Sequence, residues 1–168
     1  MEAFKPDLEE VQAFGIAVIT VSAGLIAFYG DYSAFSVVTL FLTSLAALFA
    51  RETGHRIVAQ LMNAEVTLEL SKFGALATLG AAVFAVVGEM PAVFLLPVYS
   101  VFSVEGHEQW GYDIPAMWSK REYWFAATGI LFVLSLALAA FMVESYVVSR
   151  SLALFAFFQL IPIKETAL

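Results

Sequence analysis

Cysteine is absent from this sequence, and charged residues are scarce. The absence of cysteine excludes structural disulfides, thiolate nucleophiles and cysteine-ligated metals. Charged residues make up 14 % of the 168 residues, whereas a soluble domain carries about a quarter. Eight basic residues stand against fifteen acidic ones, so the chain lacks the basic surface that nucleic-acid binding requires. We expect no nucleic-acid partner.

Hydrophobic residues form 61 % of the chain, and the mean hydropathy is +0.86. Such a chain has too little polar surface to cover a globule in water, so we expect lipid to be the solvent for much of it. The N-terminal segment MEAFKPDLEE is acidic, whereas a secretory signal begins with a basic region. The first hydrophobic run is therefore expected to be retained. The composition predicts an integral membrane protein in contact with membrane lipid.

Hydrophobic runs long enough to cross a bilayer recur along the chain. A spanning helix needs roughly 20 mainly apolar residues. The runs predict an all-α integral membrane protein with transmembrane helices at 11–30, 34–62, 122–143 and 146–163. Residues 64–104 are expected to form a hydrophobic hairpin that re-enters the membrane or supplies a fifth crossing. A polar loop is expected at 105–121.

Two parts of this hairpin are predicted to be extended. The segment EVTLEL, residues 65–70, alternates polar and apolar residues as a half-buried strand does. Pro91 and Pro97, together with several β-branched residues, disfavour a helix over 90–104. The intervening residues 73–88 are rich in Gly and Ala and are slightly short for a full span. The hairpin is thus expected to contain one apolar helix and short β elements.

The positions of the basic residues predict the orientation in the membrane. If the four helices cross and the hairpin returns, Arg150 lies towards the far side, and the other seven basic residues lie on or near the N-terminal side. Cytoplasmic loops carry an excess of Lys and Arg. We therefore predict a multi-pass protein of the cell membrane with both termini in the cytoplasm.

Arg51, Glu52 and His55 are the residues that point most directly to chemistry, because charged groups within a membrane helix usually face a protein interior or a water-filled cavity. Spacings of three and four residues allow all three to project from one helical face. This is the register of H-E-x-x-H, in which two histidines hold zinc and the glutamate activates a metal-bound water. Arginine at the first position cannot lose its proton and makes no metal ligand.

Three segments in this order resemble the core of the site-2 proteases, which are intramembrane zinc metalloproteases of the M50 family. They are the apolar helix ending in RETGH, the segment SKREYWFAATGILFVLSLALAAF and the segment LALFAFFQLIPIKETAL. The last resembles a core helix with the signature Asn-x-x-Pro, and Gln159 and Pro162 stand at those two positions. The resemblance covers roughly 34–167. It implies a three-helix core at 34–168, after an N-terminal segment and first transmembrane helix at 1–33.

Departures from the family pattern decide what the resemblance implies about activity. Residue by residue, it places Arg51 at the first zinc ligand, Glu52 at the catalytic base and His55 at the second ligand. Ala167 stands where the family has the Asp that supplies the third ligand. Catalytic zinc typically needs three protein ligands and an open position for water. The resemblance therefore implies a degenerate, inactive protein that binds no cofactor, with Glu52 as a vestige.

Residues elsewhere could rebuild a metal site only if folding brought them to His55. The candidates by residue type are Glu105, His107, Glu108 and Glu165. We interpret them as solvated loop residues, and His55 as a hydrogen-bonded histidine within a helix bundle.

Arg51 has two interpretations, between which the sequence does not choose. Its guanidinium could replace the positive charge of the missing metal by pairing with Glu52 or Glu165, since a buried charge requires a partner. The side chain could instead extend to the cytoplasmic interface, as long basic side chains near helix ends do.

The expected function is that of a structural or regulatory subunit that binds other transmembrane proteins or segments. Its binding groove would be formed by Arg51, Glu52, His55, Gln159 and Pro162. One alternative is an active zinc intramembrane protease with atypical ligands, one of them supplied by a partner chain. The other is a small ion or proton transport component, in which the charged residues of the second helix line the path.

Overall fold

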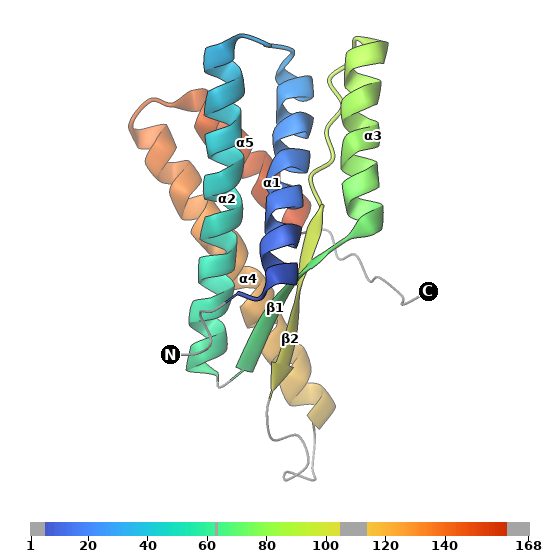
Figure 1. Ribbon diagram of the computed structural model, residues 1–168. Helices are drawn as coiled ribbons and strands as arrows, with labels where there is room; N and C mark the ends of the chain where they lie inside the picture. Colours follow the sequence, from blue (N-terminus) through green and yellow to red (C-terminus); the bar gives the residue numbers. More distant parts are fainter. Residues whose placement is uncertain (1–5, 63, 105–113, 161–168) are drawn as a thin grey trace.

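The computed structural model describes residues 6–62, 64–104 and 114–160, and these form a mostly helical molecule with one small sheet (Figure 1). The elements, in chain order, are α1 (Leu8–Tyr29), α2 (Ala34–Leu61), β1 (Ala64–Leu70), α3 (Lys72–Gly88), β2 (Val98–Val104), α4 (Ile114–Met142) and α5 (Tyr146–Gln159). The predicted helical character is confirmed. By length and composition, α1 and α2 are the described helices that could cross a membrane, and α3, α5 and the apolar part of α4 are shorter.

The first two helices form an antiparallel pair whose limits follow from local chemistry. Asp7 caps α1 by accepting the N–H of Glu10 at 2.7 Å. The helix ends at Gly30, whose positive φ of 65° is available to glycine without strain. In the turn that follows, the Asp31 carboxylate accepts the N–H of Ser33 at 3.0 Å, and this hydrogen bond holds the pKa of Asp31 below its ordinary value.

Side chains from α1, α2, α4 and α5 meet in one hydrophobic core, to which the hairpin adds a few residues. The fully buried members include Val21, Leu25, Leu40, Leu48, Leu95, Val133, Leu152 and Phe155. The outer faces of the same helices are also apolar: Phe35 is 83 % exposed, Phe49 67 % and Leu138 61 %. A soluble monomer rarely exposes so many large apolar side chains together.

The hairpin begins and ends in a two-stranded antiparallel sheet. The register runs from Ala64 opposite Val104 to Leu70 opposite Val98. This confirms the strand predicted for EVTLEL, and the alternation of buried and exposed residues along β1 matches its pattern. Because the two strands pair along their whole length, the two ends of the hairpin lie on the same side of the molecule (Figure 1).

Small residues on α3 allow the returning chain to lie directly on that helix. A Cβ at Gly74 would overlap the carbonyl oxygen of Leu96, so only glycine fits there. One turn later, the fully buried Thr78 accepts the N–H of Leu96 through Oγ1 at 3.4 Å. The sequence predicted an extended segment over 90–104, and residues 98–104 form β2.

The polar loop predicted at 105–121 is wrong over its second half, because α4 begins at Ile114. Pro115 lies in the first turn of that helix, where its missing N–H removes no helical hydrogen bond. Lys120 and Arg121 have high helix propensity, so a polar composition there did not signify a loop. The rest of the predicted loop, residues 105–113, lies outside the described residues, as do residues 161–168.

Candidate functional site

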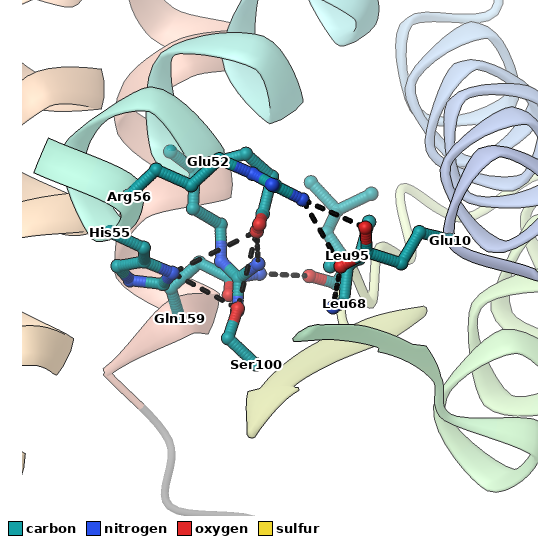
Figure 2. Close-up of polar contacts among 9 residues, drawn as sticks. Glu10, Glu52, His55, Arg56, Leu68, Leu95, Ser100 and Gln159 are labelled. Carbon is teal, nitrogen blue, oxygen red and sulfur yellow. Dashed lines mark hydrogen bonds and ion pairs between the residues drawn. The ribbon is translucent and has the colours of Figure 1, made fainter. Parts of the chain in front are cut away.

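Arg51, Glu52 and His55 all lie on the buried face of α2, as their spacing predicted. Figure 2 shows Glu52 and His55 on this face. Their exposed fractions are 6 %, 7 % and 4 %, so all three are buried. They occupy the second half of a helix whose first half contributes apolar residues to the core. Three ionisable side chains are therefore enclosed within a molecule whose outer surface is largely apolar.

The guanidinium of Arg51 pairs with the carboxylate of its neighbour, through Nη1 and Glu52 Oε1. This is the pairing required if the guanidinium supplies the charge of a missing metal. The alternative, in which Arg51 extends to the interface, is wrong, because the side chain is buried against Glu52. Whether Arg51 also approaches Glu165 lies outside the described residues. A buried pair is tolerated where either charge alone would be costly.

Ser100 of β2 joins this pair to His55. Its Oγ lies 3.0 Å from His55 Nδ1 and donates to Glu52 Oε1 at 3.2 Å, while Nδ1 itself is 3.7 Å from the same oxygen. A consistent assignment has the Nδ1–H of His55 donating to Ser100 and the Ser100 hydroxyl donating to Glu52. A Ser–His–acid relay needs the two imidazole nitrogens to face different partners. Here one nitrogen faces both, so the cluster is a hydrogen-bonded bridge and no nucleophilic triad.

The second oxygen of Glu52, Oε2, is buried and has no hydrogen-bond partner within the described part of the chain. Oε1, in contrast, accepts from both Arg51 and Ser100. The carboxylate is thus held from one side by a cation and a hydroxyl.

Two glycines allow α2 and α4 to cross closely beside His55. A Cβ on Gly54 would lie 3.0 Å from the carbonyl oxygen of Thr128, and a Cβ on Gly129 would overlap the imidazole ring of His55. The ring therefore packs directly on the backbone of α4. This contact fixes the ring plane and places Nδ1 towards Ser100.

A second, partly buried ion pair, which the sequence did not predict, lies one turn further along α2. Nη2 of Arg56 donates to both carboxylate oxygens of Glu10, at 3.1 and 3.0 Å, and Glu10 Oε1 also accepts the N–H of Leu68 in β1 at 2.9 Å (Figure 2). Glu10 is 7 % exposed, although it belongs to the acidic N-terminal segment. One carboxylate thereby connects α1, α2 and the sheet.

The remaining residues of the predicted groove are Gln159 and Pro162, of which the structure describes Gln159 (Figure 2). Gln159 donates from Nε2 to the carbonyl oxygen of Leu95 at 3.3 Å, and so binds the returning arm of the hairpin. Pro162 and Ala167 lie outside the described residues. A pocket of about 530 Å³ opens elsewhere, between the start of α1 and β1, lined by residues that include Asp7, Glu9, Glu10, Thr67 and Glu69.

The side chains that the structure describes around His55 do not fit a zinc centre. His55 is the single imidazole of the described residues, and the one nearby carboxylate is already paired with a guanidinium. Within the described part of the chain, no group of three or more His, Asp and Glu side chains is placed to hold a metal ion. A dication beside Glu52 would also be repelled by Arg51 at short range.

Comparisons with known proteins found no family model, no curated protein and no solved structure that matches this chain. The functional conclusion therefore rests on the residues and their geometry.

Proposed function

We propose that this chain is a catalytically inactive, multi-pass membrane protein with a site-2-protease-like core, and that it serves as a structural or regulatory subunit which binds other transmembrane segments. The observation that supports this most is the Arg51–Glu52 pair, buried at the position where that family places a metal ligand and a catalytic base. Both termini are proposed to lie in the cytoplasm, as the distribution of Lys and Arg favours.

The distribution of polarity supports the membrane location. The outer faces of the helices carry large apolar side chains, such as Leu76 at 70 % and Val87 at 79 % exposure on α3, while the buried set includes Arg51, Glu52 and His55. A soluble fold buries its apolar residues and places charges outside. In a bilayer the apolar exterior contacts lipid, and ionisable groups face the interior.

The enclosed ion pair supports loss of catalysis. A guanidinium cannot be deprotonated in a protein, so Arg51 cannot become a ligand at any ordinary pH. Its charge stabilises the Glu52 carboxylate, and a carboxylate held in a charge pair is a poor general base for activating water. On this proposal the chain would keep the helices of the family's core, while Arg51 and Glu52 neutralise each other's charge.

The outer face of α3 supports a role in binding another transmembrane helix. Gly80 is exposed, and a Cβ built there would meet no atom within 4 Å. Leu76 and Phe84 flank it one turn away on either side, at 70 % and 56 % exposure. A small residue between larger ones lets a second helix approach closely in lipid.

Photo-crosslinking in native membranes tests this proposal. A photoreactive amino acid is introduced at Leu76, on the outer face of α3, or at the exposed Glu65 of β1 as the matched control. We expect Leu76 to give one discrete crosslinked product with another membrane protein and Glu65 to give none. Crosslinks to lipid alone at Leu76, from a chain that purifies as a monomer, would contradict the subunit role.

The absence of native cysteine allows the topology to be tested by single-cysteine labelling. Tyr32 in the first turn and Val143 at the end of α4 are 59 % and 74 % exposed, and both are proposed to lie outside the cell. In intact cells we expect an impermeant maleimide to label Tyr32→Cys and Val143→Cys but not Glu65→Cys. The reverse pattern would overturn the orientation, and labelling of all three would overturn the membrane location.

A transport role would require Arg51, Glu52 and His55 to behave differently. A proton or ion path through the chain requires Glu52 to exchange its charge partner during each cycle, whereas the observed contacts hold Oε1 between Arg51 and Ser100. Flux measurements on the purified chain in liposomes distinguish the transport role from the subunit role. Proton or ion flux that is abolished by Glu52→Gln would favour transport over the subunit role.

A further inference from the structure

The chain returns from α3 to β2 as an extended segment, residues 90–97, which runs beside α3 and α1 (Figure 1). Three hydrogen bonds hold its lower half: the N–H of Leu96 donates to Thr78 Oγ1 at 3.4 Å, and the carbonyl of Leu95 accepts from Gln159 Nε2 at 3.3 Å. The carbonyl of Pro97 accepts the N–H of Ser71 at 2.9 Å. Residues 90–97 belong to neither a helix nor a strand. Backbone N–H and C=O groups of this segment that lack a partner must therefore find one outside regular secondary structure.

This segment lies at a depth that lipid would occupy if α1 spans the membrane. A Cβ on Gly24 of α1 would lie 3.1 Å from Leu95 Cδ2 and 3.8 Å from the carbonyl oxygen of Phe94. Gly24 precedes the end of α1 by five residues, which is about 8 Å at 1.5 Å per residue. The whole helix is about 33 Å long, close to the thickness of the hydrocarbon layer. Phe94 and Leu95 are therefore placed within that layer.

The backbone of the segment is poorly suited to contact with lipid. Among the residues that the structure describes, the N–H groups of residues 92–95 have no hydrogen-bond partner. Ala92, Val93 and Phe94 are half-buried, so part of this backbone faces outward. Irregular backbone at membrane depth occurs only where it is buried in protein or lines a water-filled cavity, because lipid offers no hydrogen bonds. Water or another polypeptide must therefore cover it.

The prolines favour water over an added strand. Pro91 and Pro97 bound the segment on both sides, and neither has an N–H to donate. Proline at a strand edge is one of the features that prevent pairing with a further strand. Four consecutive donors between two prolines offer an incoming strand only two, since alternate N–H groups point to opposite sides. Water has no such geometric requirement, because each molecule can accept from a single N–H group in any direction.

We propose that the outward side of residues 92–95 lines a water-filled crevice, open on the side of the membrane where α3 ends and closed below by the Gln159–Leu95 contact. This inference rests on the membrane location proposed above. The crevice would hold water, and small hydrophilic solutes could enter it. On this proposal the extended segment of the hairpin contacts water, and the outer face of α3 contacts lipid.

Cysteine accessibility tests this directly. Single cysteines replace Ala92 or Val93 in the extended segment, Val83 on the outer face of α3, and Tyr32 in the water-exposed turn; Val83 and Tyr32 are 63 % and 59 % exposed. Each variant is treated with a charged, impermeant methanethiosulfonate reagent, both in native membranes and as purified chain in liposomes. The thiolate attacks the sulfur of the reagent and displaces methanesulfinate, and the thiolate forms in water and not in lipid. We therefore expect rates at Ala92→Cys and Val93→Cys within about tenfold of Tyr32→Cys and at least about a hundredfold above Val83→Cys.

Three results would overturn the proposal, and they differ from one another. Rates at Ala92→Cys and Val93→Cys as low as at Val83→Cys in both preparations would mean that the segment contacts lipid or protein of the same chain. Low rates in native membranes with high rates in liposomes would mean that a partner protein covers it. A high rate at Val83→Cys as well would show that α3 is not in lipid, so the membrane location proposed for the chain would fail first.

Discussion

Two ion pairs are built on α2, one buried and one partly buried, and they differ in the elements that they connect. Arg51 pairs with Glu52, its neighbour in the same helix, whereas Arg56 pairs with Glu10 of α1, which also accepts the N–H of Leu68 in β1. The first pair neutralises charge within one element, and its link to β2 is the Ser100 hydroxyl. The second ties three elements together. The comparison separates an ion pair that neutralises charge within one helix from an ion pair that connects three elements of the fold.

We expect the largest effect from Glu10→Ala. The substitution removes the bidentate carboxylate acceptor of the partly buried Arg56 guanidinium and also removes the acceptor of the Leu68 N–H, and we expect a cost of about 3–5 kcal/mol. The free energy of unfolding in mixed micelles, followed by intrinsic fluorescence, measures this. Glu9→Ala is the matched control, because Glu9 is exposed in the same helical turn, and we expect a change within about 0.5 kcal/mol. Equal losses at the two positions would remove the structural role assigned to Glu10.

A comparison of single and double substitutions separates the two pairs most clearly. Arg51→Met alone leaves the Glu52 carboxylate buried and uncompensated, and we expect a loss of about 3 kcal/mol. Arg51→Met combined with Glu52→Gln removes both charges and is expected to return to within about 1 kcal/mol of the native chain. At the other pair, removing Glu10 and Arg56 together still leaves the Leu68 N–H without an acceptor, so that double variant stays destabilised. Full recovery at both pairs would abolish the distinction between them.

Packing is tight where α4 contacts His55 and open on the outer face of α1. Gly129→Ala would push a methyl group into the His55 ring, and overpacking of this kind costs about 1–3 kcal/mol. Gly15→Ala on the outer face of α1 is the matched control, because a Cβ there meets no atom within 4 Å. We expect it to be neutral or stabilising in the same unfolding assay. His55→Ala should relieve Gly129→Ala in a double-mutant cycle, and strict additivity would show that the two residues do not touch.

The smallest effect is expected from Ser100→Ala. This hydroxyl is half-buried and bridges His55 and Glu52, so its loss should cost about 1 kcal/mol in the unfolding assay, less than any substitution at Glu10. Ser135→Ala is the control, because Ser135 is exposed and bonds only to its own helix, at Leu131. A loss at Ser100 that equals the loss at Glu10 would mean that the Arg51–Glu52 site also holds elements together.

Local sequence patterns predicted much of the fold. Uncharged runs located α1 and α2 to within a few residues, and the alternation in EVTLEL located β1, because both depend on periodicity within a short stretch. The start of α4 differs from the prediction, because a polar composition does not distinguish a loop from a helix that contains good helix formers such as Lys120 and Arg121. Transmembrane crossing by α4 and α5 stays a prediction.

The candidate site could be predicted only in part. Spacing placed Arg51, Glu52 and His55 on one face, and the pairing of Arg51 with Glu52 followed from the need to neutralise a buried charge. Ser100 and Glu10 were missed because they reach α2 through tertiary packing, from positions 48 and 46 residues away in sequence. A serine within the otherwise apolar start of β2, and an acidic residue on the inward side of α1, were the available signals.

Zinc binding by the native chain tests the central claim most directly. Purified chain is equilibrated with zinc in mild detergent, and the bound metal is measured for the native chain and for His55→Ala. If Arg51 has taken the place of a metal beside Glu52, both proteins bind far less than one zinc per chain and do not differ. One zinc per native chain, lost in His55→Ala, would contradict this account and would favour an enzyme with an unusual ligand set.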